Sequence, residues 1–165
     1  GGLVVAGVMG GAGLGISLLA LPFLAPALRR VCIPYVPATP AQLKNVAAAL
    51  SSRLPTSAPL APLVDLGSGD GRVVLQCARH GIRSTGIELN SLLVVYSKWA
   101  AFRQRGSLAA PASFMRSDLF KVNLKSFNTA VIFGAESMME PLASKVEEMR
   151  CGSRLVACRF PLPQS

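Results

Sequence analysis

From residue 63 onward, short apolar runs alternate with amphipathic segments, and no other feature of the sequence restricts the fold as strongly. Apolar runs that alternate with helical patterns are typical of parallel strands connected by helices. We expect strands at Leu63–Leu66, Ser84–Glu88, Ser113–Arg116, Thr129–Phe133 and Arg154–Phe160. Helices are expected at Arg72–His80, at Leu92–Phe102 and after Ser137. The pattern therefore predicts an α/β fold with helices on both faces of a parallel sheet.

The stretch VDLGSGDGR (residues 64–72) places a glycine at every second position between the first expected strand and the first expected helix. Such a turn needs residues that tolerate positive φ, and it exposes backbone N–H groups to a ligand. Nicotinamide, flavin and S-adenosylmethionine (SAM) folds all use such a turn. Gly67, Gly69 and Gly71 are spaced more tightly than the GxGxxG pattern of dinucleotide-binding folds. Asp65, at the strand end, disfavours a pyrophosphate and favours a ligand with a cationic amino or sulfonium group.

Two further acidic residues follow the next two expected strands. Glu88 ends the second strand, where a carboxylate can accept both hydroxyl groups of a ribose. Asp118 follows the third strand, where it can reach an adenine amino group, with Phe114 or Phe120 as an apolar wall. Together with Asp65 these residues predict a SAM site. We expect cofactor contacts from Asp65, Gly67, Ser68, Gly69, Gly71, Glu88, Asn90 and Asp118.

The helix ends and one helix face give further expectations. Thr39 and Gln42 have the spacing of a capping box at the start of a helix that precedes the sheet. Asp70 is interpreted as the N-cap of the helix after the glycine-rich turn, and Ser137 with Glu140 as a second capping box. An apolar stripe at helical spacing is expected to pack into the core; it consists of Leu92, Val95, Tyr96, Trp99 and Phe102.

The first 28 residues carry no charge. As a helix, the first 21 would span about 30 Å, which matches the apolar core of a bilayer. Arg29 and Arg30 follow, where lipid phosphates would lie. We predict a membrane anchor; a buried helix and a secretory signal are the alternatives. The predicted parts are a transmembrane anchor (1–28), a basic, proline-rich strap with a connecting helix (29–62) and a SAM-binding domain (63–165).

The charge distribution favours an anionic neighbour. The chain has 17 basic and 8 acidic residues, and residues 29–63 contain basic charges only. An excess of this kind suits a membrane surface or a nucleic acid. The four cysteines are interpreted as buried free thiols; they are Cys32, Cys77, Cys151 and Cys158. With a single histidine and no CxxC pair, the sequence predicts no metal site.

Several motifs resemble those of a known family, the mitochondrial membrane-anchored, SAM-dependent protein-lysine methyltransferases. They are PALRRVCIPYVPAT (26–39), VDLGSGDGRVVL (64–75), GIELN (86–90), SDLFKV (117–122), VIFG (131–134) and ACRFPLP (157–163). The resemblance implies a Rossmann-like class I fold with seven strands and SAM as cofactor. It also implies a single-pass protein of the mitochondrial inner membrane whose catalytic domain faces the matrix. SAM contacts carry over to Asp65, Gly67, Gly69, Glu88 and Asp118.

The same resemblance implies a lysine of a membrane protein as substrate. Within the family, VIFGAESMM and CRFPLP favour the ATP synthase c-subunit, and the ADP/ATP carrier is the alternative. The sequence stops after the fifth expected strand, whereas the family continues into two more, so a truncated domain is expected. Two further alternatives stay open: an RNA methyltransferase, although the Asn/Asp-Pro-Pro-Tyr and Pro-Cys signatures are missing, and an inactive SAM-binding module tethered to the membrane.

Transfer of a methyl group to an amine requires that the lysine arrive neutral, although its ordinary pKa is about 10.4. A dry channel that aligns the amine with the methyl donor meets this requirement. The expected channel residues follow the fourth and fifth strands; they are Phe133, Gly134, Glu136, Phe160 and Pro161. The sequence identifies no general base among them.

Overall fold

The computed structural model of the chain describes residues 36–52 and 59–163. All described residues belong to one compact unit of the chain. None of the helices in these ranges is both long and apolar enough to span a bilayer. The predicted anchor at residues 1–28 lies outside the described residues.

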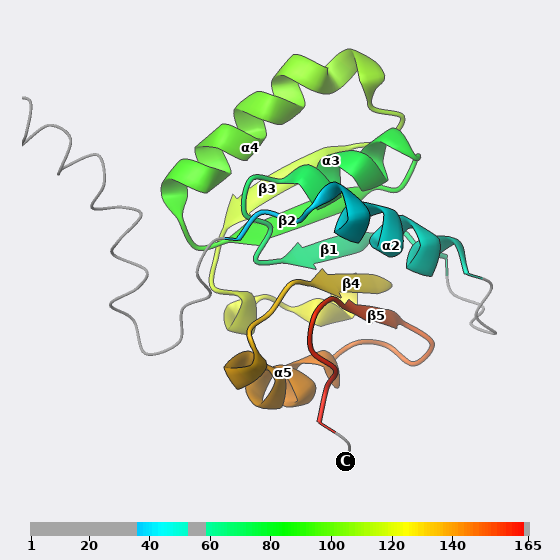
Figure 1. The fold of residues 1–165 in the computed structure, drawn as a ribbon, viewed down its shortest axis with the longest axis vertical. Coiled ribbons are helices and arrows are strands. Elements are labelled where there is room, and N and C mark those ends of the chain that lie inside the picture. Colours follow the sequence, from blue (N-terminus) through cyan, green and yellow to red (C-terminus); the bar gives the residue numbers. More distant parts are fainter. Residues whose placement is uncertain (1–35, 53–58, 164–165) are drawn as a thin grey trace, which may run out of the picture. The chain divides into compact units, whose positions relative to one another are not determined.

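Five parallel strands form one sheet in the order β3-β2-β1-β4-β5 (Figure 1). The strands are β1 (Leu63–Leu66), β2 (Ser84–Glu88), β3 (Ala112–Arg116), β4 (Thr129–Ile132) and β5 (Arg154–Ala157). β1 and β4 are buried along their whole length, as expected of central strands covered on both faces. The predicted α/β fold with a parallel sheet is confirmed.

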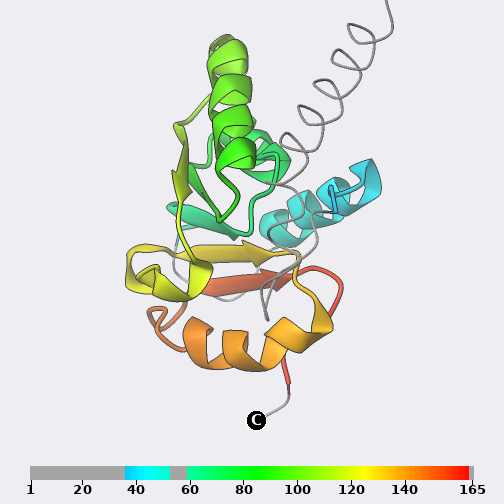
Figure 2. The ribbon, with the colours of Figure 1, turned by 90° about the vertical axis from the view of Figure 1, so that its left-hand side faces the viewer.

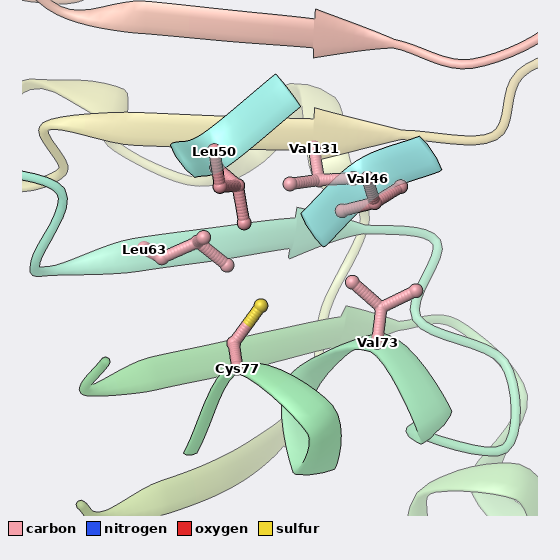
Figure 3. Close-up of a cluster of buried hydrophobic side chains, with 6 residues drawn as sticks. All are labelled: Val46, Leu50, Leu63, Val73, Cys77 and Val131. Atoms are coloured by element: carbon pink, nitrogen blue, oxygen red, sulfur yellow. The ribbon is translucent and has the colours of Figure 1, made fainter. Parts of the chain in front are cut away.

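Helices α2 (Pro40–Ser51) and α3 (Arg72–Arg79) cover one face of the sheet, and α5 (Met139–Val146) lies on the other (Figure 2). Side chains of α2 and α3 meet those of β1 and β4 in one apolar cluster (Figure 3). Its buried members are Val46, Leu50, Leu63, Val73, Cys77 and Val131. This cluster fixes α3, and therefore the turn that precedes it, against the sheet.

The capping box at the start of α2 is confirmed. The Thr39 hydroxyl accepts a hydrogen bond from the Gln42 N–H (3.2 Å), and the Gln42 side chain accepts one from the Thr39 N–H (2.8 Å). The other two predicted caps are wrong. Gly71 is the N-cap of α3, and Asp70 instead accepts from the N–H of Arg72 (3.3 Å). A 3-10 turn, Glu136–Met138, precedes α5, so Met138 rather than Ser137 stands at its N-cap.

The predicted core stripe on α4 (Ser91–Gln104) is also wrong. Its five side chains are exposed, and they form what we call the α4 outer face: Leu92, Val95, Tyr96, Trp99 and Phe102. The buried side of α4 is made by Leu93, Val94, Ser97 and Ala100, which pack toward α3 and β3. The aromatic side chains Tyr96, Trp99 and Phe102 therefore lie on the exposed side of the helix.

Two smaller expectations need correction. The fifth strand ends at Ala157 rather than at Phe160, because Arg159 has a φ of 105° that a strand does not accommodate. The cysteines are not all buried. Cys77 is buried and burial raises its thiol pKa to about 12, but Cys151 is exposed.

Candidate functional site

The carboxyl ends of β1, β2 and β4 lie side by side, because Leu66 pairs with Ile87 of β2 and with Ile132 of β4. β2 lies on one side of β1 in the sheet, and β4, which comes later in the chain, lies on the other side. The strand order therefore reverses its direction at β1. Parallel α/β sheets bind ligands outside the strand ends at such a switch point. The glycine-rich turn from Gly67 to Gly71 begins there, where the sequence places the cofactor site.

The turn depends on three glycines in the left-handed region. Gly67, Gly69 and Gly71 have φ values of 82°, 53° and 80°, which cost other residues free energy. The N–H groups of Gly67 and Ser68 both donate to the carbonyl of Ile87 (2.9 Å each). The turn is therefore fastened to the end of β2, and its glycine spacing follows from its backbone conformation.

Glu88 joins the two loops that border the site. One carboxylate oxygen accepts from the N–H of Gly69 (3.0 Å), and the other accepts from the N–H of Asn90 (2.8 Å). Each oxygen keeps a further lone pair for another donor. Glu88 therefore shapes the site and can still accept hydrogen bonds from two ribose hydroxyl groups.

Asp65 lies inside β1 and is almost completely buried. Burial raises the pKa of its carboxyl group to about 8, and the carboxylates of Glu88 and Asp70 add to the shift. A buried carboxyl group with acidic neighbours gains most from a cation. This environment fits a cofactor that brings a positive charge, as SAM does.

Asn90 and Asp118 both act as helix caps in this structure. The Asn90 side chain accepts from the N–H of Leu92 (2.9 Å) at the start of α4. The Asp118 carboxylate accepts from the N–H of Phe120 (3.0 Å) at the start of a 3-10 turn, Leu119–Lys121. Both side chains therefore have fixed orientations at the strand ends. Their contacts with a cofactor stay predictions.

Two residues that support the turn were not identified from the sequence. The Ser97 hydroxyl is buried and donates to the carbonyl of Gly69 (3.1 Å). At Gly86, a Cβ atom would come within 2.5 Å of the Ser68 hydroxyl oxygen and 2.7 Å of a Phe114 ring carbon. Phe114 is therefore a core residue packed beneath the turn, and its role as an apolar wall beside the adenine stays a prediction. A glycine inside a strand pattern signals such a close approach.

The Ser68 side chain, for which cofactor contact was predicted, lies in this packed region. Its hydroxyl group is buried and has no hydrogen-bond partner among the described residues. The approach to Gly86 places this side chain on the sheet side of the turn. The contact of Ser68 with the cofactor stays a prediction.

The predicted channel residues follow β4 and β5, whose ends are joined by a hydrogen bond from the Cys158 N–H to the Ile132 carbonyl (2.9 Å). Phe133 is half-buried and packs against the apolar cluster of α2 and α3. Gly134 is buried, and a Cβ atom there would overlap Met139. The remaining three, Glu136, Phe160 and Pro161, are exposed. A channel formed by the five residues stays a prediction.

The raised pKa of Asp65 predicts a pH dependence of SAM affinity. Below about pH 8 the carboxyl group of the ligand-free protein is protonated, whereas a cation binds best to the carboxylate. Affinity is therefore expected to rise with pH toward 8, by at most about tenfold per pH unit, and then to level off. Calorimetric titration between pH 6 and 9 measures this. Asp65→Asn should bind more weakly and show only the titration of the ligand itself; identical pH profiles of the two proteins would contradict the assignment.

Two family models match different parts of the chain. Residues 65–165 match the ANTKMT methyltransferase domain, and residues 2–29 match the N-terminal domain of the ATP synthase c-subunit lysine N-methyltransferase. The first match covers the turn, the strand ends and β5. The second falls on the uncharged segment that was predicted to be an anchor.

Curated relatives agree with these matches. The chain is 58% identical to the ATP synthase c-subunit lysine N-methyltransferase of Caenorhabditis elegans, over 99% of this chain and 86% of the relative. It is 37% identical to the adenine nucleotide translocase lysine N-methyltransferase of Mus musculus, over 93% of this chain and 66% of the relative. The resemblance found in the sequence is confirmed.

A solved structure shows the same fold with a product of the cofactor bound. It is an RNA methyltransferase from Salinibacter ruber in complex with S-adenosyl-L-homocysteine, with a TM-score of 0.62 and 26% identity. The similarity covers 74% of this chain and 76% of that one. The class I fold and the cofactor expected from the turn are thus confirmed. The chain belongs to the family of SAM-dependent lysine N-methyltransferases that includes the ATP synthase c-subunit and adenine nucleotide translocase enzymes.

Proposed function

We propose that this chain methylates a lysine of the ATP synthase c-subunit at the mitochondrial inner membrane, with its catalytic domain in the matrix. The observation that carries the proposal is the 58% identity, over 99% of the chain, to a relative named for that substrate. The match of residues 2–29 to the N-terminal domain named for the same enzyme supports it. A segment of 28 uncharged residues suits an enzyme whose substrate lies in a membrane.

The described residues fit SAM. The buried carboxyl group of Asp65 suits the cationic end of the cofactor, Glu88 the ribose and Asp118 the adenine. When bound, SAM supplies an activated methyl group beside a positive charge. The protein has to hold the donor, admit the lysine without its proton and exclude water. We assign the last two tasks to the segments after β4 and β5, where Phe133 and Phe160 provide apolar surface.

Two other substrates have specific support. The ADP/ATP carrier is favoured by the match of residues 65–165 to a domain named for the translocase enzyme. RNA is favoured by the formal net charge of +9 and by the Salinibacter ruber structure. The higher identity to the c-subunit enzyme, 58% against 37%, ranks the c-subunit first.

A transfer assay with radiolabelled SAM tests the proposal. The full chain is incubated with mitochondrial membranes from cells that lack the enzyme, and the labelled proteins are separated and identified by mass spectrometry. We expect label on one lysine of the c-subunit and none in a parallel reaction with Glu88→Ala, which removes the carboxylate that holds the turn. Label on the carrier or in RNA would replace the c-subunit as the substrate. SAM binding without any transfer would show an inactive binding module.

A further inference from the structure

The α4 outer face is an unusual surface for a helix that flanks a parallel sheet. Val95 and Phe102 are each 64% exposed, Trp99 is 51% exposed and Tyr96 is 50% exposed. In Figure 1, no described element lies on the side of α4 that faces away from β2 and β3. Large apolar side chains gathered on one exposed face mark an interaction site.

Two arginine side chains lie over aromatic rings at the C-terminal end of this helix. The Arg103 guanidinium lies 5.0 Å from the centre of the Trp99 ring, and the Arg105 guanidinium lies 4.6 Å from that of Phe102. Lys98 is exposed on the same helix. Between Glu88 and Asp118 the chain contains basic residues and no acidic one. The surface therefore combines apolar rings with positive charge, and no carboxylate of this segment opposes an anionic partner.

The chemistry favours a lipid surface over a protein. Tyrosine and tryptophan beside arginine suit the headgroup region, where the rings contact acyl chains and the guanidinium groups contact phosphates. A second copy would bring like charges together across a symmetric interface, which opposes association. A helix of 14 residues is about 21 Å long, so one exposed stripe along it has a small surface area. That area is well below the roughly 800 Å² that each partner buries in a stable protein interface.

We propose that the α4 outer face docks onto an anionic lipid bilayer. Trp99, Tyr96 and Phe102 enter the headgroup region, and Arg103 and Arg105 pair with lipid phosphates. α4 begins at Ser91, directly after the site residues Glu88 and Asn90. Docking through this helix therefore holds the SAM-binding edge of the sheet at the membrane surface. The inference does not depend on which protein is the substrate.

The chain contains one tryptophan, Trp99, so its fluorescence reports on this surface alone. The full chain is reconstituted into vesicles of phosphatidylcholine, with or without phosphatidylglycerol, that carry brominated acyl chains. In anionic vesicles we expect a blue shift of Trp99 emission, quenching by the brominated lipid and protection from acrylamide. In purely zwitterionic vesicles these changes should be much smaller.

Charge variants test the proposal without disturbing the core. Arg103→Gln with Arg105→Gln should lower the ratio of docked to undocked protein about tenfold, because each basic residue near an anionic surface contributes to binding. Lys125→Gln with Arg150→Gln removes the same charge from exposed positions outside α4 and should leave the quenching unchanged. Circular dichroism of both variants checks that the fold is kept.

Three outcomes would overturn the proposal. The first is emission that stays exposed to acrylamide although the protein is bound to anionic vesicles. The second is equal quenching in zwitterionic and anionic bilayers, which would exclude a role for charge. The third is a blue shift without lipid that grows with protein concentration, which would assign the face to a second copy of the chain.

Discussion

Replacing Glu88 by alanine is expected to weaken SAM binding about 100-fold. The carboxylate accepts from two backbone N–H groups, at Gly69 and Asn90, and in the proposed complex it also holds the ribose. A hydrogen bond to a charged group contributes about 1.5–3 kcal/mol. If the variant loses two such hydrogen bonds of the Glu88 carboxylate in the complex, the free energy of SAM binding becomes less favourable by roughly 3 kcal/mol. That free energy corresponds to about a factor of 100 in the dissociation constant. Calorimetric titration of the full chain with SAM measures it.

Glu88→Gln is the matched comparison. Glutamine keeps one carbonyl acceptor of similar reach, so it should retain one of the two backbone contacts and lose about tenfold in affinity. Far-ultraviolet circular dichroism of both variants shows whether the fold is kept. Unchanged SAM affinity in a folded Glu88→Ala protein would remove Glu88 from the cofactor site.

Gly71→Ala is expected to lower the free energy of unfolding by about 3 kcal/mol or more. The residue has a φ of 80°, which costs a residue with a Cβ about 1–2 kcal/mol. The new methyl group would also come within 2.6 Å of the Phe114 ring and 2.9 Å of the Ser97 hydroxyl oxygen. Phe114 is packed in a buried cluster, so it cannot move away without cost. Urea unfolding followed by circular dichroism measures the change.

Gly81→Ala separates the two causes. Gly81 has the same φ of 80°, but no atom lies within 4 Å of a Cβ built there. This variant should therefore lose only the backbone cost, about 1 kcal/mol. Equal losses at the two positions would show that the overlap with Phe114 and Ser97 contributes nothing.

The sequence was a good guide to the strands and to the turn because both depend on local patterns. β1, β4 and the turn after β1 combine apolar runs with glycines at the strand-to-helix connection. Parallel topology then brings Asp65 and Glu88 to neighbouring strands. What the pattern could not reveal is that Glu88 holds the turn through the Gly69 N–H, since that contact depends on the three-dimensional path of both loops.

The error on α4 has a different cause. This helix is apolar on nearly all sides, so periodicity identifies faces without telling which one is buried. Leu93 and Val94 are buried, whereas Leu92 and Val95, which are the same two residue types, are exposed. The orientation of α4 therefore follows from its tertiary contacts with β2 and β3, which a one-dimensional pattern does not contain.

The strand order has a consequence for the way the chain folds. β1 pairs with β2, which follows after one short helix, but its other neighbour, β4, comes only after β2, α4 and β3 have been made. Closing the longer connection costs more chain entropy, so the unit from β1 to β3 is expected to form first. During synthesis the edge of β1 that pairs with β4 then stays unpaired until β4 has been made. Hydrogen exchange on a refolding chain should therefore protect β2 before β4.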